Sequence, residues 1–219
     1  MKPIPHGSIE YINCLRCKQT SINKSVPVRR KHSFVSEVKV LKLLEKNFIN
    51  EPKINHYPFP RLFEVDYKEQ IMSISNCGID LKYNYKNNII SPKLINSYLH
   101  KTIQCISNNL NYNRIILTDF IPRIDDKNNK IYPTKNVCVD ENGYIYLIDL
   151  ADPEFGDNFY KTPTKKELNK TIQLYNSLKH QAKHTEPDKD LIKNYKEFQK
   201  SPFVLWSILC MFVNIIDSQ

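Results

Sequence analysis

A β-hairpin is the strongest local signal in the sequence and restricts the fold more than any other feature. Residues 137–139 and 144–148 are rich in β-branched and aromatic side chains, and they flank the tetrapeptide Asp-Glu-Asn-Gly. The Asn-Gly pair tolerates the positive φ of a tight turn, so the two segments are predicted to pair as antiparallel strands. The second strand runs into Asp149, and a buried aspartate is costly unless a cation or hydrogen-bond donors meet it.

Two interpretations of Asp149 follow from its position. Asp149 could begin a turn or cap a helix at Leu150-Ala151, as aspartates commonly do. Asn136, however, stands immediately before the first strand of the same hairpin. An Asn and an Asp at the two ends of a hairpin can direct their oxygen atoms toward one cation, and this is a sensible way to hold Mg²⁺ against phosphates.

The order of elements around the hairpin predicts a single α+β domain over residues 1–219. The first part, residues 1–75, reads as strands with one amphipathic helix, residues 34–46, for which Ser33 is the expected N-cap. After a hinge-like Asn-Cys-Gly, residues 79–219 are mostly helical and form a second lobe with a cleft between the two. The expected strands are 8–28, 61–66 and 70–75. In the second part, one helix is expected to begin at Ser91-Pro92, and three later helices are expected over residues 166–180, 188–199 and 203–216.

Composition places the chain among intracellular proteins. Six cysteines are spread along the chain without the dense spacing of a secreted disulfide scaffold, and the start of the chain lacks the apolar core of a signal peptide. The apolar run 203–216 is too short to span a bilayer comfortably, so a cytoplasmic protein with no membrane partner is expected, with a tail anchor as the alternative. The many Lys, Asn, Ile and Tyr residues indicate an AT-rich genome, and the compact size would fit a viral protein in the host cytoplasm or the virion.

The block "KNVCVDENGYIYLIDL" resembles the protein-kinase-like superfamily, in which a catalytic loop ending in Asn leads into a hairpin whose far end carries the metal-binding Asp. The resemblance implies a small bilobed fold that binds ATP and Mg²⁺, with Asn136 and Asp149 as metal ligands. It also implies transfer of the γ-phosphoryl group of ATP to a serine or threonine hydroxyl of a protein substrate.

Other segments extend the resemblance. Glu37 looks like the first-lobe helix glutamate that pairs with a strand lysine, and Lys18 is the candidate for that lysine, with Lys24, Arg29, Arg30 and Lys31 as alternatives. Residues 71–78, "IMSISNCG", are similar to the strand and hinge that hold adenine. Within "IILTDFIP", Asp119 looks like the catalytic aspartate, and Asp125 or Asp126 could serve instead. The expected adenine-binding residues are Met72, which lies near the gatekeeper position, Ile74 and Asn76.

Two further functions remain open. Only Gly7 precedes Lys18, Leu117 stands in the place of the family's histidine, and the catalytic loop carries an insertion over about residues 124–135. An inactive pseudokinase, kept as a module that binds a partner protein, would show the same features. The net charge of +9 would suit nucleic acid, but the basic residues are not gathered into a stripe, so this partner is ranked last.

Overall fold

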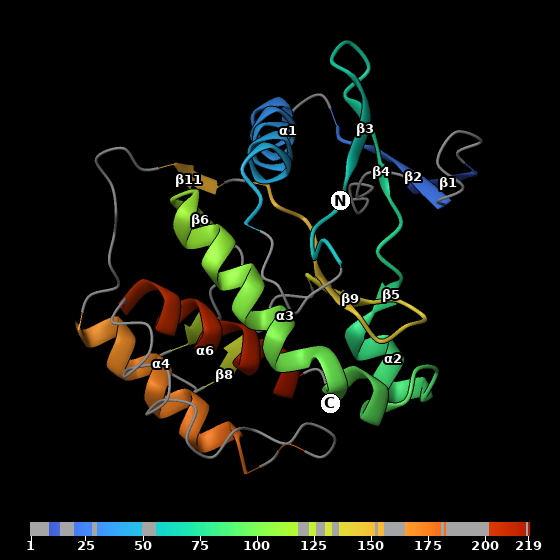
Figure 1. The fold of residues 1–219 in the computed structure, drawn as a ribbon. Helices are drawn as coiled ribbons and strands as arrows, with labels where there is room; N and C mark the ends of the chain where they lie inside the picture. The colour runs from blue at the N-terminus through green and yellow to red at the C-terminus, as the bar shows by residue number, and fades with distance from the viewer. Residues whose placement is uncertain are drawn as a thin grey trace, which may run out of the picture.

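The chain folds into a mixture of helices and small antiparallel sheets, which confirms the predicted α+β class. Figure 1 shows a four-stranded sheet and helix α1 at one end, with most of the remaining helices at the other. The computed structural model describes residues 9–13, 20–27, 30–49, 56–117, 123–125, 130–132, 136–151, 153–155, 165–180, 182, 202–217 and 219.

The four-stranded sheet is antiparallel throughout, with the order β1-β2-β4-β3. Two of the predicted strands, 61–66 and 70–75, are found as the pair β3 and β4, joined by a tight turn. Strands β2 and β4 lie in the middle of the sheet. As in any β-strand, their successive side chains point to opposite faces of the sheet. The four strands are β1 (Ile9–Asn13), β2 (Thr20–Ser25), β3 (Leu62–Asp66) and β4 (Ile71–Ser75).

Helix α1 (Lys31–Lys46) follows the sheet's second strand and carries the predicted apolar stripe. Phe34, Val38, Leu41 and Leu44 are all buried. The prediction of Ser33 as N-cap is wrong, because the helix starts earlier and its N-cap is Arg30. The reason is a turn just upstream, in which the Arg30 N–H donates to the Pro27 carbonyl at 2.7 Å and brings the chain into the helix before Ser33 is reached.

Among the described residues, the rest of the chain supplies three small sheets and four further helices. Strand pairs are β5 with β9, β9 with β10, β6 with β11, and β7 with β8. The predicted helix 188–199 lies outside the described residues. The elements are β5 (Ile79–Asp80), α2 (Leu81–Asn87), α3 (Pro92–Tyr112), β6 (Ile115–Leu117), β7 (Arg123–Asp125), β8 (Lys130–Tyr132), β9 (Val137–Val139), β10 (Ile145–Leu147), β11 (Pro153–Phe155), α4 (Lys165–Leu178) and α6 (Pro202–Asp217).

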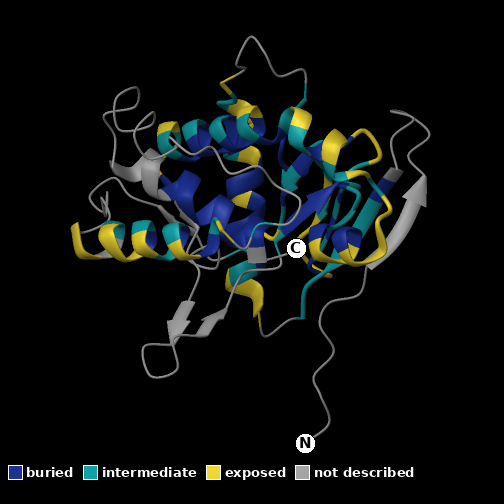
Figure 2. Ribbon diagram, turned by 90° about the horizontal axis from the view of Figure 1, so that it is seen from below, coloured by how far each residue is buried: buried dark blue, intermediate teal, exposed yellow. Residues whose placement is uncertain are grey.

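Helix α3 begins as the sequence predicts. The Ser91 hydroxyl accepts a hydrogen bond from the Leu94 N–H at 3.3 Å, and Pro92 occupies the first turn, where its missing N–H costs nothing. Helix α6 packs against α3 and α4, and every residue from 207 to 216 is buried. In Figure 2 this stretch is dark blue throughout. None of the described helices is both long enough and apolar enough to cross a membrane.

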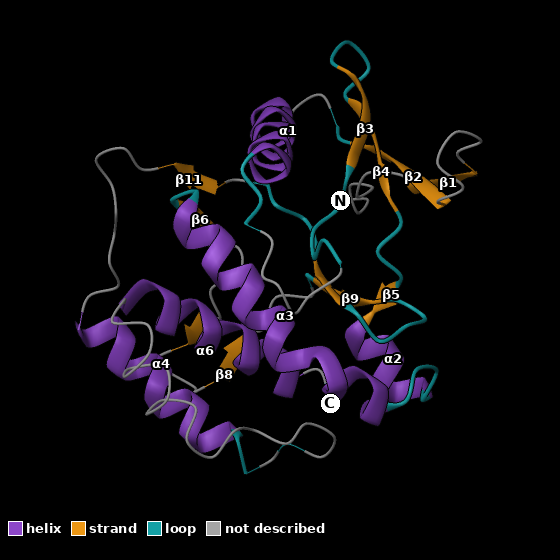
Figure 3. Ribbon diagram, in the orientation of Figure 1, coloured by secondary structure: helices purple, strands orange, loops and turns teal. Residues whose placement is uncertain are grey.

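The predicted hairpin is present as β9 and β10. Ile145 lies opposite Val139 and Leu147 opposite Val137, and all four side chains are buried. Gly143 has φ +80°, as the Asn-Gly turn requires. Figure 3 shows β5 beside β9, close to the start of α2, so the hairpin adjoins the segment that leaves the four-stranded sheet. This position places the end of β10 near the sheet and α1.

Candidate functional site

Lys24 joins two acidic residues from distant parts of the chain. Its Nζ donates to both carboxylate oxygens of Glu37, at 2.9 and 2.8 Å, and to Oδ1 of Asp149 at 2.8 Å. Three hydrogen bonds use the full donor capacity of an ammonium group. We call these three residues the ion triad. It connects the four-stranded sheet, helix α1 and the end of the hairpin at one point.

Strand β2 delivers the lysine. Lys24 lies directly opposite Met72 on β4, and Ile22 lies opposite Ile74. Directly opposed residues share a face of the sheet, so these four side chains lie on the face that looks toward α1. Met72 is fully buried and 9% of Ile74 is exposed, which leaves Lys24 as the polar member of an otherwise apolar surface.

The lysine that pairs with Glu37 is therefore Lys24, one of the alternatives to Lys18. Lys18 lies outside the described residues. Lys18 and Lys24 are six positions apart, an even number, so simple alternation assigns both to the same face of a strand. Strand β2 begins at Thr20, so Lys24 lies within it.

Helix α1 delivers the glutamate. Glu37 lies three residues after Phe34 and four before Leu41, so it shares the helix face that packs into the core. Only 2% of its side chain is exposed. Besides Lys24, the backbone of Leu150 forms a hydrogen bond with the Glu37 carboxylate. Glu37 is therefore a buried glutamate on the core-facing side of α1.

The end of the hairpin delivers Asp149. The Ile148 N–H donates to the carbonyl of Asn136 at 2.9 Å, which continues the hairpin pairing beyond β9 and β10. Asp149 then adopts φ +55°, in the left-handed region where Asp and Asn are enriched among non-glycine residues. Half of its side chain is exposed, while the following Leu150 is fully buried. The strand thus ends on a backbone bend that turns the carboxylate toward Lys24.

The expected site also includes Asn136 and Asp119, and only Asn136 is among the described residues. Asn136 is half-buried and lies across the hairpin from Ile148, one residue before Asp149. This backbone hydrogen bond sets Asn136 opposite the residue that precedes Asp149. Asp119 and its alternative Asp126 lie outside the described residues. Asp125 is the last residue of β7, which pairs only with β8 in the described part of the chain.

Burial and charge act in opposite directions on the ion triad. Burial raises the pKa of Glu37, the nearby Asp149 carboxylate raises it further, and the Lys24 ammonium only partly opposes both. Burial by itself would lower the pKa of Lys24, but its attraction to the two carboxylates outweighs this, so the net shift is upward. The lysine is thus held in its charged form. Two carboxylates facing one ammonium leave an excess of negative charge when both acids are ionised.

The expected adenine-binding segment leaves the sheet at the end of β4. The Asn76 side chain accepts a hydrogen bond from the Gly78 N–H at 2.9 Å and so shapes the turn into β5. Gly78 has φ +87°, and a Cβ added to it would lie 2.0 Å from the Val139 carbonyl oxygen. Only glycine allows the chain to pass this close to β9. Met72, Ile74 and Asn76 therefore lie along one continuous path beside the ion triad.

No protein-family model matches this chain, and neither does any curated protein.

Proposed function

We propose that this chain is a divergent, ATP-dependent phosphotransferase of the protein-kinase-like type, acting on a serine or threonine hydroxyl of a protein. The observation that carries the proposal is the ion triad. A strand lysine paired with a helix glutamate, together with an aspartate for Mg²⁺, is the arrangement that protein kinases need for phosphoryl transfer. Here Lys24, Glu37 and Asp149 come from a strand, a helix and the end of a hairpin, as that arrangement requires.

The order of elements also supports the proposal. A small sheet with one helix precedes the turn at Asn76-Cys77-Gly78, and mostly helical structure follows it. We interpret these two parts as the lobes of a bilobed kinase-like domain, with ATP between them. Met72, Ile74 and Asn76 would contact the adenine, since they follow the path from the lysine-bearing face of the sheet to the connection between the lobes.

The chemistry of the triad fits phosphates and a magnesium ion. Lys24 stays charged and keeps 22% of its side chain exposed, and so it would hold the nonbridging oxygens of the ATP phosphates, with Glu37 fixing its position. Asp149 and Asn136 offer oxygen ligands of the kind that Mg²⁺ prefers. Bound Mg²⁺ would neutralise negative charge on the phosphates. Asp119 would orient the accepting hydroxyl group.

Turnover of Mg·ATP tests the proposal. We expect phosphate transfer to a generic protein substrate by the wild-type chain and its loss in Asp149→Asn, which removes the metal-binding charge without changing the shape of the side chain. Glu69→Gln, a neutralised acid in the exposed turn between β3 and β4, is the matched control and should retain activity. Equal turnover by wild type and Asp149→Asn would refute the assignment of the site.

One observation favours a second candidate, a pseudokinase that binds a partner protein without catalysis. All three N–H groups of Lys24 are already used by Glu37 and Asp149, so a phosphate must displace one of these bonds. In a pure binding module the triad would only hold sheet, helix and hairpin together. A ligand that binds the folded state must raise its melting temperature. Absence of any shift with ATP and Mg²⁺ would favour the module.

A further inference from the structure

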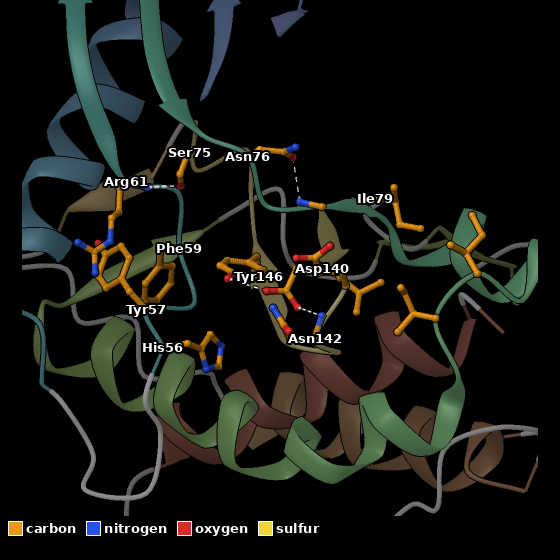
Figure 4. A pocket seen from close by; sticks show the side chains of 15 residues that line it. His56, Tyr57, Phe59, Arg61, Ser75, Asn76, Ile79, Asp140, Asn142 and Tyr146 are labelled. Atoms are coloured by element: carbon orange, nitrogen blue, oxygen red, sulfur yellow. Dashed lines mark hydrogen bonds between the residues drawn. The ribbon is translucent and has the colours of Figure 1, made fainter. Parts of the chain in front are cut away.

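A cavity of about 700 Å³ lies outside the ion triad, on the surface formed by four chain segments. The segments are residues 56–61, the end of β4 with the turn into β5, the loop after α2, and the β9–β10 hairpin with its turn. None of the three triad residues contributes to its lining. Its size is in the range of protein ligand sites, so it is large enough to hold a peptide side chain or a small molecule. Figure 4 shows its two chemically different ends.

One end is aromatic and positively charged. The Arg61 guanidinium lies 5.5 Å from the centre of the Tyr57 ring, and Phe59 packs edge-on against the same ring. The Arg61 backbone is fixed, because its N–H donates to the Ser75 hydroxyl at 2.9 Å and its carbonyl accepts from the Ser75 N–H at 2.9 Å. No carboxylate among the described residues forms an ion pair with Arg61, which is exposed. Its guanidinium group is therefore available to bind an external acidic group.

The other end is aliphatic, formed by Ile79, Ile89 and Ile90. The fully buried Asn84 fixes the loop after α2: its amide NH₂ donates to the Ile90 carbonyl at 3.1 Å, and its oxygen accepts from the Ile90 N–H at 2.7 Å. This loop presents Ile89 with 51% of its surface exposed. A rigidly held, exposed isoleucine next to two half-buried ones is suited to cover another aliphatic side chain.

Asp140 lies between the two ends, and its carboxylate is already hydrogen-bonded within the protein. Asp140 accepts hydrogen bonds from the N–H groups of Asn142 and Tyr144, at 3.0 and 2.9 Å, and from the Tyr146 hydroxyl at 3.2 Å. These donors satisfy its carboxylate within the hairpin. Glu141 is exposed at the tip of the turn. Arg61 and Glu141 are therefore the charged lining residues that form no ion pair among the described side chains, and Arg61 supplies the positive charge, at the aromatic end.

We propose that this cavity is a docking site for an extended peptide segment of a partner protein. The segment would place an acidic side chain on Arg61 and an aliphatic side chain against Ile79, Ile89 and Ile90. Arginine and aromatic side chains dominate binding energy at such sites, and a carboxylate can bind the guanidinium group through two parallel hydrogen bonds. The cavity and the triad share no residue, and the inference is argued from Arg61 and the three isoleucines, none of which has a role in the proposed activity. Asn76, a proposed adenine contact, is the one residue of the proposed nucleotide site that also lines the cavity.

Peptide binding to the full chain tests the site. The probes are fluorescein-labelled octapeptides of Gly and Ser that carry one Leu and one Glu at different separations, and a second set carries Lys in place of Glu. Fluorescence anisotropy should show saturable binding by at least one Leu–Glu peptide and weaker binding by its Lys counterpart. Arg61→Glu and Ile89→Asp should each weaken binding by about tenfold or more. Arg61→Glu should also improve binding of the Leu–Lys peptide.

Controls separate this site from the ion triad. Tyr83→Ser, an exposed substitution on α2 outside the cavity, should leave binding unchanged, as should Asp149→Asn. Loss of turnover in Asp149→Asn with peptide binding intact would show that the two sites are independent. The inference is overturned if no Leu–Glu peptide binds at about 1 mM, if the Leu–Lys set binds wild type equally well, or if neither cavity substitution matters. Octanoate binding as tightly as the best peptide would overturn the peptide assignment.

Discussion

Removing Lys24 should expose the cost of the buried Glu37 charge. The Lys24→Met substitution keeps a long side chain in β2 but deletes the ammonium that contacts Glu37 at 2.8 and 2.9 Å. At 2.8 Å two unit charges attract by about 6 kcal/mol with an effective dielectric constant near 20. Most of this gain offsets the desolvation of the two ions, so the net value of the intact pair is small. The loss of one partner is different, because Glu37 remains buried without a cation.

We expect Lys24→Met to lower the free energy of unfolding by about 2–4 kcal/mol at pH 7, somewhat less than the roughly 3–5 kcal/mol for breaking a fully buried ion pair. The value is reduced from that of a fully buried pair because 22% of the lysine side chain is exposed. The double variant Lys24→Met/Glu37→Gln carries no orphaned charge and should be more stable than Lys24→Met alone by about 1–2 kcal/mol. Asp149→Asn should cost less than about 1 kcal/mol, since the Asp149 side chain is half exposed.

The pH dependence of Lys24→Met follows from Glu37. The folded-state pKa of Glu37 is already raised by burial, and losing Lys24 removes the main influence that lowers it. A raised folded pKa gives a contribution to stability that is full below the unfolded value, about 4.3, and is lost as the pH rises through the folded value. The stability deficit of Lys24→Met should therefore be smaller at about pH 5 than at about pH 7, while Glu64→Gln, an exposed control on β3, should show no such change.

Urea unfolding of wild type and the four variants at both pH values provides the assay. If Lys24→Met and Lys24→Met/Glu37→Gln have the same free energy of unfolding at pH 7, the two residues are not coupled and the ion pair does not form in solution. If Lys24→Met does not fold at pH 7, recovery of a cooperative transition at pH 5, or in the double variant, still reports the coupling. Failure to recover in either case would contradict the reasoning.

Three further predictions concern other parts of the chain. Gly78→Ala should lower the free energy of unfolding by about 2–5 kcal/mol, because its Cβ would meet the Val139 carbonyl at a positive φ; thermal and urea unfolding against wild type will measure it. Asn109→Leu should lower the free energy of unfolding by about 2–4 kcal/mol. The buried Asn109 side chain donates to the Ile49 carbonyl at 3.1 Å and accepts from the Ile49 N–H at 2.8 Å, and the substitution removes both hydrogen bonds. A loss under about 0.5 kcal/mol would exclude these bonds. Because the pKa of Lys24 is raised, wild-type stability should decline more steeply than that of Lys24→Met above about pH 10.4, as Lys24 loses its proton.

Local patterns were sufficient for the elements whose signals are local. The Asn-Gly turn predicted β9 and β10, and Ser91-Pro92 predicted the start of α3, because both depend on the backbone preferences of neighbouring residues. The prediction of Ser33 as the N-cap of α1 was wrong because it also rested on local preference alone. It is a good N-cap residue, but a turn at Pro27 had already placed the chain in the helix.

The identity of the pairing lysine could not be obtained from local patterns. Lys18 and Lys24 satisfy the same alternation, and the choice between them depends on which residue lies opposite Met72 on a strand about fifty positions away. The burial of Glu37 is likewise a tertiary result, since its helix spacing is compatible with a core position only if a cation meets it there. The positive φ of Asp149 arises where the hairpin ends against α1 and Lys24, and composition carries no sign of it.

The ion triad contains one fixed acid and one that can leave. Glu37 has 2% of its side chain exposed and receives hydrogen bonds from both Lys24 and the Leu150 backbone, so moving it would disturb the core. Asp149 has half of its side chain exposed and makes one hydrogen bond to the lysine, at the surface of the triad. A divalent cation that binds Asp149 would weaken that hydrogen bond. One N–H of Lys24 would then be available to donate to a phosphate oxygen. Under the proposed function, Mg²⁺ and ATP should therefore bind cooperatively, each raising the affinity for the other, because both compete with the same hydrogen bond.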